Sequence, residues 1–176
     1  MSVFVSDGNV YISGFTGAPG ANQRATLWRN GQQQTLSDTP SSGSSVLVSG
    51  GNVYVAGFTG TGVNQRASLW RNGQQQTLSN TQSWGNSMYV SDGNVYVSGF
   101  TGTGATTRAM LWRNGQPQTL SDTMSFASSV FISGGNVYVA GATGTDANMR
   151  AVLWRNGNTW ALSGGVGRAD AIFVIR

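Results

Sequence analysis

The residue types that usually carry acid–base or nucleophilic chemistry are scarce in this sequence. It has no histidine, cysteine, lysine or glutamate, so its six acidic residues are all aspartates and its ten basic residues are all arginines. A nucleophilic serine would lack both histidine and lysine as its base. Glycoside hydrolysis needs two facing carboxyl groups, and no acidic position is filled in every one of the repeats described below. The sequence therefore predicts no catalytic residue, no metal site and no cofactor.

Two short glycine-containing segments could suggest ligand chemistry, but turn formation explains them better. Residues 57–62 read Gly-Phe-Thr-Gly-Thr-Gly, without the following helix and Gly-Lys-Ser/Thr ending of a phosphate-binding loop. Asp7-Gly8-Asn9 lacks the further carboxylates of a calcium loop, and two of its repeats have glycine in place of the aspartate. We interpret both segments as turns.

The net charge of +4 is spread along the chain, because eight of the ten arginines are Arg24, Arg29 and their repeats. No basic patch or stripe of the kind that binds nucleic acid is present. No apolar run reaches the roughly 18 residues of a membrane span, and Met1 leads directly into repeat sequence without a signal peptide. We expect no nucleic-acid partner and no membrane insertion.

One heptapeptide organises the sequence. Residues 25–31 read Ala-Thr-Leu-Trp-Arg-Asn-Gly, and the pattern Ala-x-Leu-Trp-Arg-Asn-Gly returns at residues 67–73, 109–115 and 151–157. The four tryptophans are 42 residues apart each time. The chain thus consists of four copies of one short repeat.

Each repeat contains four short apolar runs separated by turn residues, and this pattern predicts an all-β fold. In the first unit, Val3–Val5 and Val10–Ile12 flank the hairpin signal Asp7-Gly8, and Asn30-Gly31 joins the tryptophan strand to a fourth strand. We expect the first strand to be innermost and buried on both faces. Four antiparallel strands in about 42 residues predict a β-propeller blade.

The predicted organisation is a single propeller domain over residues 1–176, or a part of a propeller that closes by oligomerisation. Its blades cover approximately residues 1–43, 44–85, 86–127 and 128–168, and residues 169–176 form an extra inner strand. The extra strand is predicted because residues 171–175 align with the first strand of a blade.

The motifs S-x-V-x-V, G-N-V-Y-V-x-G-F and A-x-L-W-R-N-G with a closing T-L resemble a known group of blades. They are similar to bacterial β-propellers with recently amplified, nearly identical repeats, distantly related to NHL and SBBP-type blades. The resemblance covers essentially the whole chain. It implies a propeller fold and a secreted or cell-surface bacterial protein, and it brings no catalytic residue with it.

The seventeenth predicted strand points to the protein itself as a partner. An unused apolar strand with free edges invites pairing with another copy. We expect a homo-oligomer whose ring is completed through Ile172 to Ile175 or through Val3 to Val5. A four-bladed monomer closed by either terminus is the alternative.

Variation among the repeats gathers in two loops, the one between the second and third strands and the one between consecutive units. Both lie on the same face of a four-stranded antiparallel blade, so we expect a ligand or partner there. A tryptophan or phenylalanine on that face could stack on a sugar or a protein, or could cap the gap between blades. The candidate residues are Ser42, Trp84, Phe126, Arg168, Asn22, Asn64, Thr106 and Asn148.

The repeated tryptophan is predicted to be structural. Strand alternation places Arg24 and Trp28 on one face, where the guanidinium could stack on the indole. For function, we expect a non-catalytic repeat propeller that acts as a scaffold for binding and self-assembly. A multivalent lectin, or an engineered or excised fragment without a defined ligand, are the alternatives. A glycan or a protein is the expected ligand.

Overall fold

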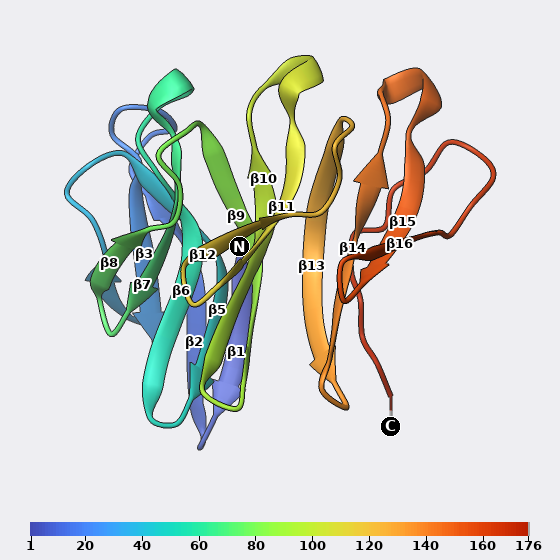
Figure 1. Ribbon diagram of the computed structural model, residues 1–176. Coiled ribbons are helices and arrows are strands. Elements are labelled where there is room, and N and C mark those ends of the chain that lie inside the picture. The colour runs from blue at the N-terminus through green and yellow to red at the C-terminus, as the bar shows by residue number, and fades with distance from the viewer. Residues whose placement is uncertain (176) are drawn as a thin grey trace. The chain divides into compact units, whose positions relative to one another are not determined.

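The computed structural model describes residues 1–175, apart from the side chain of Asp146. Over these residues the chain forms four separate four-stranded antiparallel sheets, which confirms an all-β fold built from propeller blades (Figure 1). The strands follow one another in chain order within each sheet. Blades 1 and 2 comprise β1 (Ser2–Ser6), β2 (Asn9–Thr16), β3 (Arg24–Arg29), β4 (Gln32–Thr35), β5 (Ser41–Ser49), β6 (Asn52–Thr59), β7 (Arg66–Arg71) and β8 (Gln74–Thr77). Blades 3 and 4 comprise β9 (Ser83–Ser91), β10 (Asn94–Thr101), β11 (Arg108–Arg113), β12 (Gln116–Thr119), β13 (Ser125–Ser133), β14 (Asn136–Thr143), β15 (Arg150–Arg155) and β16 (Asn158–Ala161).

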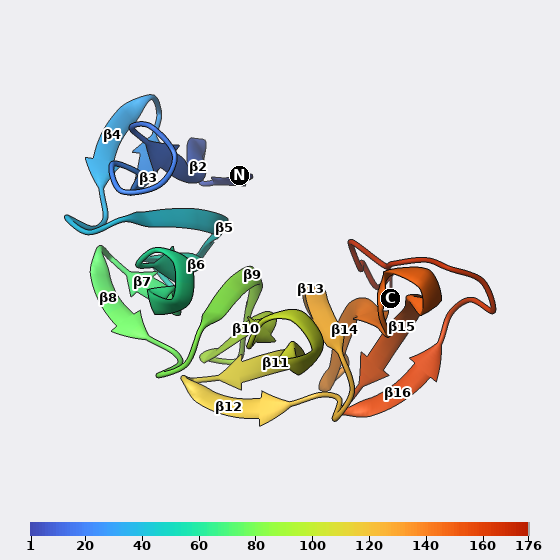
Figure 2. The ribbon, with the colours of Figure 1, turned by 90° about the horizontal axis from the view of Figure 1, so that it is seen from above.

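The chain divides into two compact units, residues Met1–Gly85 and the part from Asn86 onward. Each unit holds two consecutive blades, whose strands can be followed from above in Figure 2. Short 3-10 turns, η1 (Gly62–Asn64), η2 (Gly104–Thr106) and η3 (Asp146–Asn148), stand between the second and third strands of blades 2, 3 and 4. None of the helical segments in the described residues has the length and apolar character needed to cross a membrane.

The tight turns of each blade are those that the sequence predicts. Asp7 and Gly8 have φ of 49° and 73°, and Asn30 and Gly31 have φ of 50° and 81°. Positive φ at both central residues gives the turn the same twist as the strands that it joins. We call the end of a blade that carries these two turns its hairpin end, and the opposite end its loop end.

The first strand of a complete blade is longer than the sequence pattern suggests. β5 runs over nine residues, and its polar first half pairs with residues 57–59 of β6 before a register shift between Gly43 and Ser45. This half is rich in serine and glycine, so the sequence predicts a loop there. In the structure its backbone pairs with β6 and extends the β5–β6 ladder. The expected burial on both faces is wrong, since Val46 is buried whereas Leu47 and Val48 are only half-buried.

The hydrophobic core of each unit lies between its two blades. In the first unit, Tyr11, Leu27 and Leu36 of blade 1 cluster with residues of blade 2 that include Val46 and Trp70. The second unit repeats this arrangement with Tyr96, Leu111, Leu120, Val130 and Trp154. A blade therefore buries its apolar side chains against the next blade rather than within itself.

The C-terminal segment does not form the predicted extra strand over the part that the structure describes. Residues 169–175 contain no strand, and Arg176 lies outside the described residues. The segment is nevertheless tied to blade 4: the Ala169 N–H donates to the Gly141 carbonyl at 3.2 Å, and the Ile172 N–H donates to Ser129 Oγ at 3.3 Å. It lacks strand character because no second strand is present to pair with it.

Candidate ligand-binding site: crevices between consecutive blades

An equivalent crevice opens between the two blades of each unit. The first crevice has a volume of about 230 Å³ and the second about 130 Å³. Tyr11, Leu27, Arg29, Gln34, Leu36, Val53, Val55, Trp70, Asn72 and Gly73 line the first crevice. Tyr96, Leu111, Arg113, Gln118, Leu120, Val137, Val139, Trp154, Asn156 and Gly157 line the second. Each position in one list has the same residue type at the corresponding place in the other.

Each crevice has an arginine stacked on a tyrosine at its wall. The Arg29 guanidinium carbon lies 5.5 Å from the centre of the Tyr11 ring, and Arg113 lies at the same distance from Tyr96. The contact arises because Tyr11 on β2 stands directly opposite Arg29 on β3. Stacking fixes the guanidinium while leaving its N–H groups able to donate at the ring edge.

The sequence predicts that Arg24 stacks on Trp28, but the pair that recurs in the structure is arginine on tyrosine. Arg24 instead turns to the loop end, where its Nη1 donates to the carbonyls of Ala21 and Gln23 at 2.8 and 3.0 Å. Residues directly opposite on neighbouring strands lie closer than residues four apart on one strand, so the cross-strand pair forms.

An asparagine clamp holds the opposite wall of the first crevice. The Asn72 carboxamide oxygen accepts from the Val53 N–H at 2.9 Å, and its nitrogen donates to Asn52 Oδ1 at 2.9 Å. Across the mouth, a Cβ added to Gly73 would lie 3.0 Å from the Gln34 amide nitrogen, and Gly157 stands in the same relation to Gln118. The two walls thus meet at the mouth, where a side chain larger than glycine would intrude.

The deepest polar group beside each crevice is an indole N–H without a partner in the protein. Trp70 and Trp154 are 1% and 0% exposed, and neither Nε1 has a hydrogen-bond acceptor. A Cβ added to Gly141 would lie 2.8 Å from Trp154 Cζ3, so the six-membered ring faces Gly141. Nε1 belongs to the five-membered ring, on the edge of the indole away from Gly141. Trp112 Nε1, which lines neither crevice, is also without a partner, so the unpartnered indole N–H recurs among the described tryptophans and is not specific to the crevices.

Arginine is the only charged residue type that lines either crevice. The remaining polar groups are the amides of glutamine and asparagine and a tyrosine hydroxyl, above a floor of leucine, valine and tryptophan. Pockets that enclose a drug-sized ligand usually have about 300–1,000 Å³, so each crevice suits a single ring or functional group. The arrangement can bind an acceptor-rich or anionic group and has no acid or base beside it.

The predicted loop-face residues lie at the loop ends of their blades, away from the crevices. Asn22, Asn64, Thr106 and Asn148 are exposed in the connections between second and third strands. Ser42, Trp84 and Phe126 lie on β5, β9 and β13 rather than in loops, and all three are half-buried. Arg168 lies in the C-terminal segment and forms an exposed ion pair of 2.5 Å with Asp170.

Phe126 packs at 77° against Phe100, with 5.3 Å between ring centroids, as a residue that caps a blade would. A hollow of about 150 Å³ does open at the loop end of the first unit, between residues that include Gln23, Pro40 and Phe58. None of the eight predicted residues lines it. Their role as a partner face stays a prediction, for which loss of binding in Trp84→Ala is the test.

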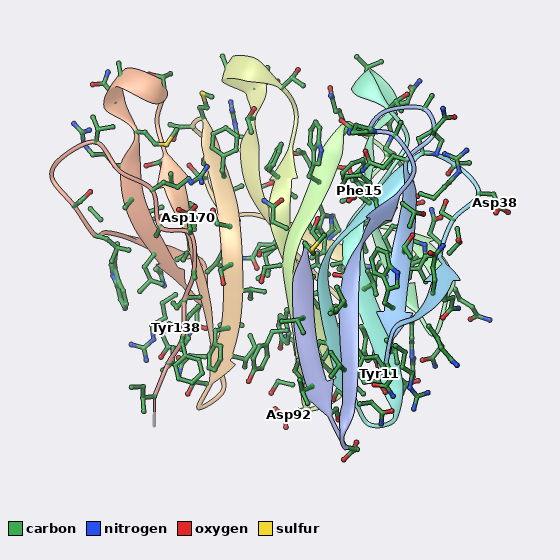
Figure 3. All side chains as sticks on the ribbon, turned by 180° about the vertical axis from the view of Figure 1, so that it is seen from behind. Tyr11, Phe15, Asp38, Asp92, Tyr138 and Asp170 are labelled. Atoms are coloured by element: carbon green, nitrogen blue, oxygen red, sulfur yellow. The ribbon has the colours of Figure 1, made fainter. Side chains whose placement is uncertain are left out.

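Sequence reasoning missed the crevices because every residue in them is repeated. Arg29 and Tyr11 recur in each repeat and were assigned no role from the sequence, and Asn30 was interpreted only as part of a turn. The available signal was the pairing of an arginine with a tyrosine in neighbouring strands, which the hairpin register would have placed face to face. In Figure 3 the Tyr11 side chain lies toward the hairpin end of its blade and Phe15 toward the loop end.

The described aspartates do not assemble into a reactive group. Asp7 and Asp92 lie in hairpin turns, where each accepts from the preceding serine hydroxyl at 2.9 Å. Asp38 lies in the connection between β4 and β5, and Asp170 lies in the C-terminal segment after β16. Among the described residues no three metal-ligating side chains gather into a cluster.

The fold is shared with solved propeller-type structures. The chain matches the xylan β-1,4-xylosidase from Bacillus halodurans C-125 with a TM-score of 0.53 and 15% identity, over 96% of this chain and 45% of that one. It matches the Trypanosoma rangeli sialidase in complex with sialic acid with a TM-score of 0.54 and 12% identity, over 92% and 36%. The Pyrococcus horikoshii acylaminoacyl peptidase gives a TM-score of 0.55 and 11% identity, over 92% and 26%.

This chain therefore spans between about a quarter and about a half of each of these proteins. At such identities the likeness shows the fold alone. No family model matches the chain, and no curated relative matches it. The resemblance to NHL and SBBP-type blades is not tested by these structures and stays a prediction.

The comparison corrects the function expected from the sequence. A non-catalytic scaffold for binding and self-assembly, with a lectin or a ligandless fragment as alternatives, is contradicted because the structural neighbours are mostly glycoside hydrolases. The sequence argument went wrong by treating missing histidine and glutamate as a guide to the whole protein class. The neighbours' activities are their own, and bear on this chain only as support for a proposal.

Proposed function

We propose that this chain belongs to a carbohydrate-processing propeller protein and binds acidic saccharide units of its substrate in the crevices between consecutive blades. The single observation that carries the proposal is the recurrence of one crevice in both units, with a stacked arginine at the wall and no acidic side chain in the lining. The fold shared with a xylosidase and a sialidase supports the same class of substrate.

The chemistry of the crevice favours a sugar that carries a carboxylate. The Arg29 fork matches the two oxygens of a carboxylate, and the buried Tyr11 ring on which it stacks holds the guanidinium in place. No carboxylate lines the crevice, so nothing there repels an anion. The net charge of +4 adds a weak attraction at longer range.

The test is calorimetric titration with an oligosaccharide of uronic acid units and with its neutral counterpart. The double variant Arg29→Met/Arg113→Met removes the charge from both described crevices. We expect its affinity for the acidic oligosaccharide to fall roughly tenfold or more, because a charge-assisted hydrogen bond contributes about 1.5–3 kcal/mol.

The matched control is Arg24→Met/Arg108→Met, which lowers the net charge equally but at the loop ends. Both control arginines are held there by backbone carbonyls, Arg108 by that of Ala105 at 2.9 Å. Binding should change little in the control. An equal loss in both double variants would mean that only net charge matters, and no binding of either oligosaccharide would reject the proposal.

Hydrolysis is read separately on the same three proteins, the unmodified chain and the two double variants. Aryl glycosides of an acidic and a neutral sugar report product release. Turnover that falls in the crevice variant and persists in the control variant would place the crevices on the path of the reaction. Turnover that is equal in both would locate the reacting substrate elsewhere.

A further inference from the structure

Blade 1 and blade 4 each have an exposed apolar surface, and the two surfaces are complementary. In the first unit Leu36 of blade 1 is 8% exposed, because blade 2 covers it, whereas the corresponding Leu162 of blade 4 is 55% exposed. On the other side, Val46 and Val130 are 4% and 3% exposed, whereas the corresponding Val3 is 63% exposed. The surface that blade 4 leaves uncovered is the one that blade 2 covers on blade 1.

The C-terminal segment already occupies part of that uncovered surface. Relative to blade 4 it makes the contacts that β13 makes relative to blade 3. The Gly167 N–H donates to the Met149 carbonyl at 3.1 Å, as the Ser125 N–H does to Thr107 at 3.1 Å. The Ile172 N–H donates to Ser129 Oγ at 3.3 Å, as the Val130 N–H does to Ser87 Oγ at 3.4 Å.

The aromatic contacts agree with these hydrogen bonds. Phe173 lies 5.2 Å from Phe131 between ring centroids, and Phe131 lies 4.7 Å from Tyr89. Residues 167–175 thus follow the path of the first strand of a further blade. Phe173 and Ile175 remain 76% and 85% exposed because no second strand accompanies them.

Blade 1 has the converse deficiency. β1 pairs with β2 only from Ser2 opposite Ser13 to Ser6 opposite Asn9. In blade 2 the corresponding strand continues to Ser41 opposite Thr59. The inner edge of Gly14, Phe15 and Thr16 therefore has no strand beside it, and a segment of nine residues would fill it where β1 does not.

We propose that a second copy of this chain docks its blade 1 on the open side of blade 4, and that residues 167–175 replace β1 as the first strand of that blade. By the register of blade 2, Val174 would stand opposite Val10 of the second copy, as Val48 stands opposite Val53. Replacement of β1 by residues 167–175 lengthens the pairing with β2, and the docked blade covers Leu162 and Trp160. This mode of association is β-strand addition at an exposed edge. The contact is head-to-tail, so it builds species of two or more chains.

Substitution of Gly14 can test docking without disturbing the fold of the single chain. A Cβ on Gly57 or Gly141 would collide with the backbone carbonyl of Ser42 or Phe126, so the first strand passes too close to allow a side chain. A Cβ on Gly14 meets Trp28 Cζ3 at 3.3 Å and the Met1 side chain beyond it, because β1 does not reach so far. Gly14→Ala is therefore tolerated within one chain but blocks an incoming Arg168 carbonyl.

The experiment measures molar mass by light scattering after size exclusion, over a range of concentrations. We expect the full chain to associate and Gly14→Ala to remain single at nearly the melting temperature of the dilute full chain. The chain without residues 167–176 should also remain single, with a somewhat lower melting temperature because it loses the hydrogen bonds and the Phe173 contact that this segment makes with blade 4. The chain without residues 1–6 should still associate. Val63→Asp, at an exposed apolar position of the loop end, is the control and should behave like the full chain.

Disulfide capture tests the register, since the chain has no cysteine of its own. Chains with Val174→Cys are mixed with chains with Val10→Cys, and we expect a disulfide between them. A full chain that stays single at every concentration overturns the proposal. Association that survives loss of residues 167–176, or that is lost with residues 1–6, overturns it as well.

Discussion

Trp70 and Trp28 occupy the same place in two copies of one repeat and have different surroundings. Trp70 is 1% exposed between blades 1 and 2, whereas Trp28, on the open side of blade 1, is only half-buried. The same contrast separates Leu120, 6% exposed, from Leu162, 55% exposed. The burial of a residue in this protein is thus decided by the neighbouring blade, and the repeat itself does not bury it.

The largest expected effect concerns the tryptophans. Trp70→Ala should lower the free energy of unfolding by about 3–5 kcal/mol, because it leaves a cavity between two blades. Trp28→Ala should cost less than half of that, since one face of its ring has no blade against it. Urea denaturation followed by circular dichroism, at a dilution where chains are single, measures both. A nearly neutral Trp70→Ala would contradict the packing account.

The leucines give the next contrast. Leu120→Ala should destabilise the protein by about 2–4 kcal/mol, whereas Leu162→Ala should cost below about 1 kcal/mol as a change at a largely exposed position. The same denaturation measurement applies. Equal losses in the two variants would mean that Leu162 is covered in the single chain, against its exposure of 55%.

Substitution of the glycines at equivalent positions of the second strand should also cost more stability in blade 2 than in blade 1. Gly57→Ala should cost about 1–3 kcal/mol or more, because the added carbon collides with the Ser42 carbonyl and the strands must separate. Gly14→Ala should cost well under about 1 kcal/mol, since only side chains stand near it and they can adjust. A loss as large for Gly14→Ala would show that a strand already passes there in the single chain.

The smallest effects are expected at the arginines. Arg29→Met should cost about 0.5–1 kcal/mol, as removal of one cation–π contact of an exposed arginine does. Arg155 at the open end lies 5.6 Å from the Tyr138 ring and 5.8 Å from the Trp160 ring. Arg155→Met should therefore lower the melting temperature more than Arg29→Met does. The reverse order would mean that the arginine between blades 1 and 2 contributes more to stability than Arg155 on blade 4.

Much of the fold could be predicted because it depends on local rules. Asn30-Gly31 specifies a hairpin wherever it occurs, since both residues adopt positive φ at little cost. The recurrence of Trp28 at a fixed spacing specifies repeated blades. The serine-rich half of β5 could not be recognised, because its place in the ladder depends on pairing with β6 and has no apolar alternation to signal it.

The candidate site was less predictable than the fold. The loop-end residues Trp84 and Phe126 were chosen as candidates because they vary among the repeats, whereas Arg29 and Tyr11, which do not vary, were not singled out. A crevice forms only when one blade stands beside another, so no single repeat contains it. Its second wall, with Asn72 and Trp70, comes from the next copy of the sequence.

The sequence by itself determined the local geometry of this protein: four antiparallel strands to a blade, their tight turns and the order of the strands. These features follow from short-range backbone preferences and from pairing between neighbours in the chain. Only the tertiary structure decided which copies of a residue are buried, where the crevices open and how the C-terminal segment lies on blade 4. Those outcomes depend on the contact between consecutive blades, and identical repeats acquire different roles there because some have a neighbour and others do not.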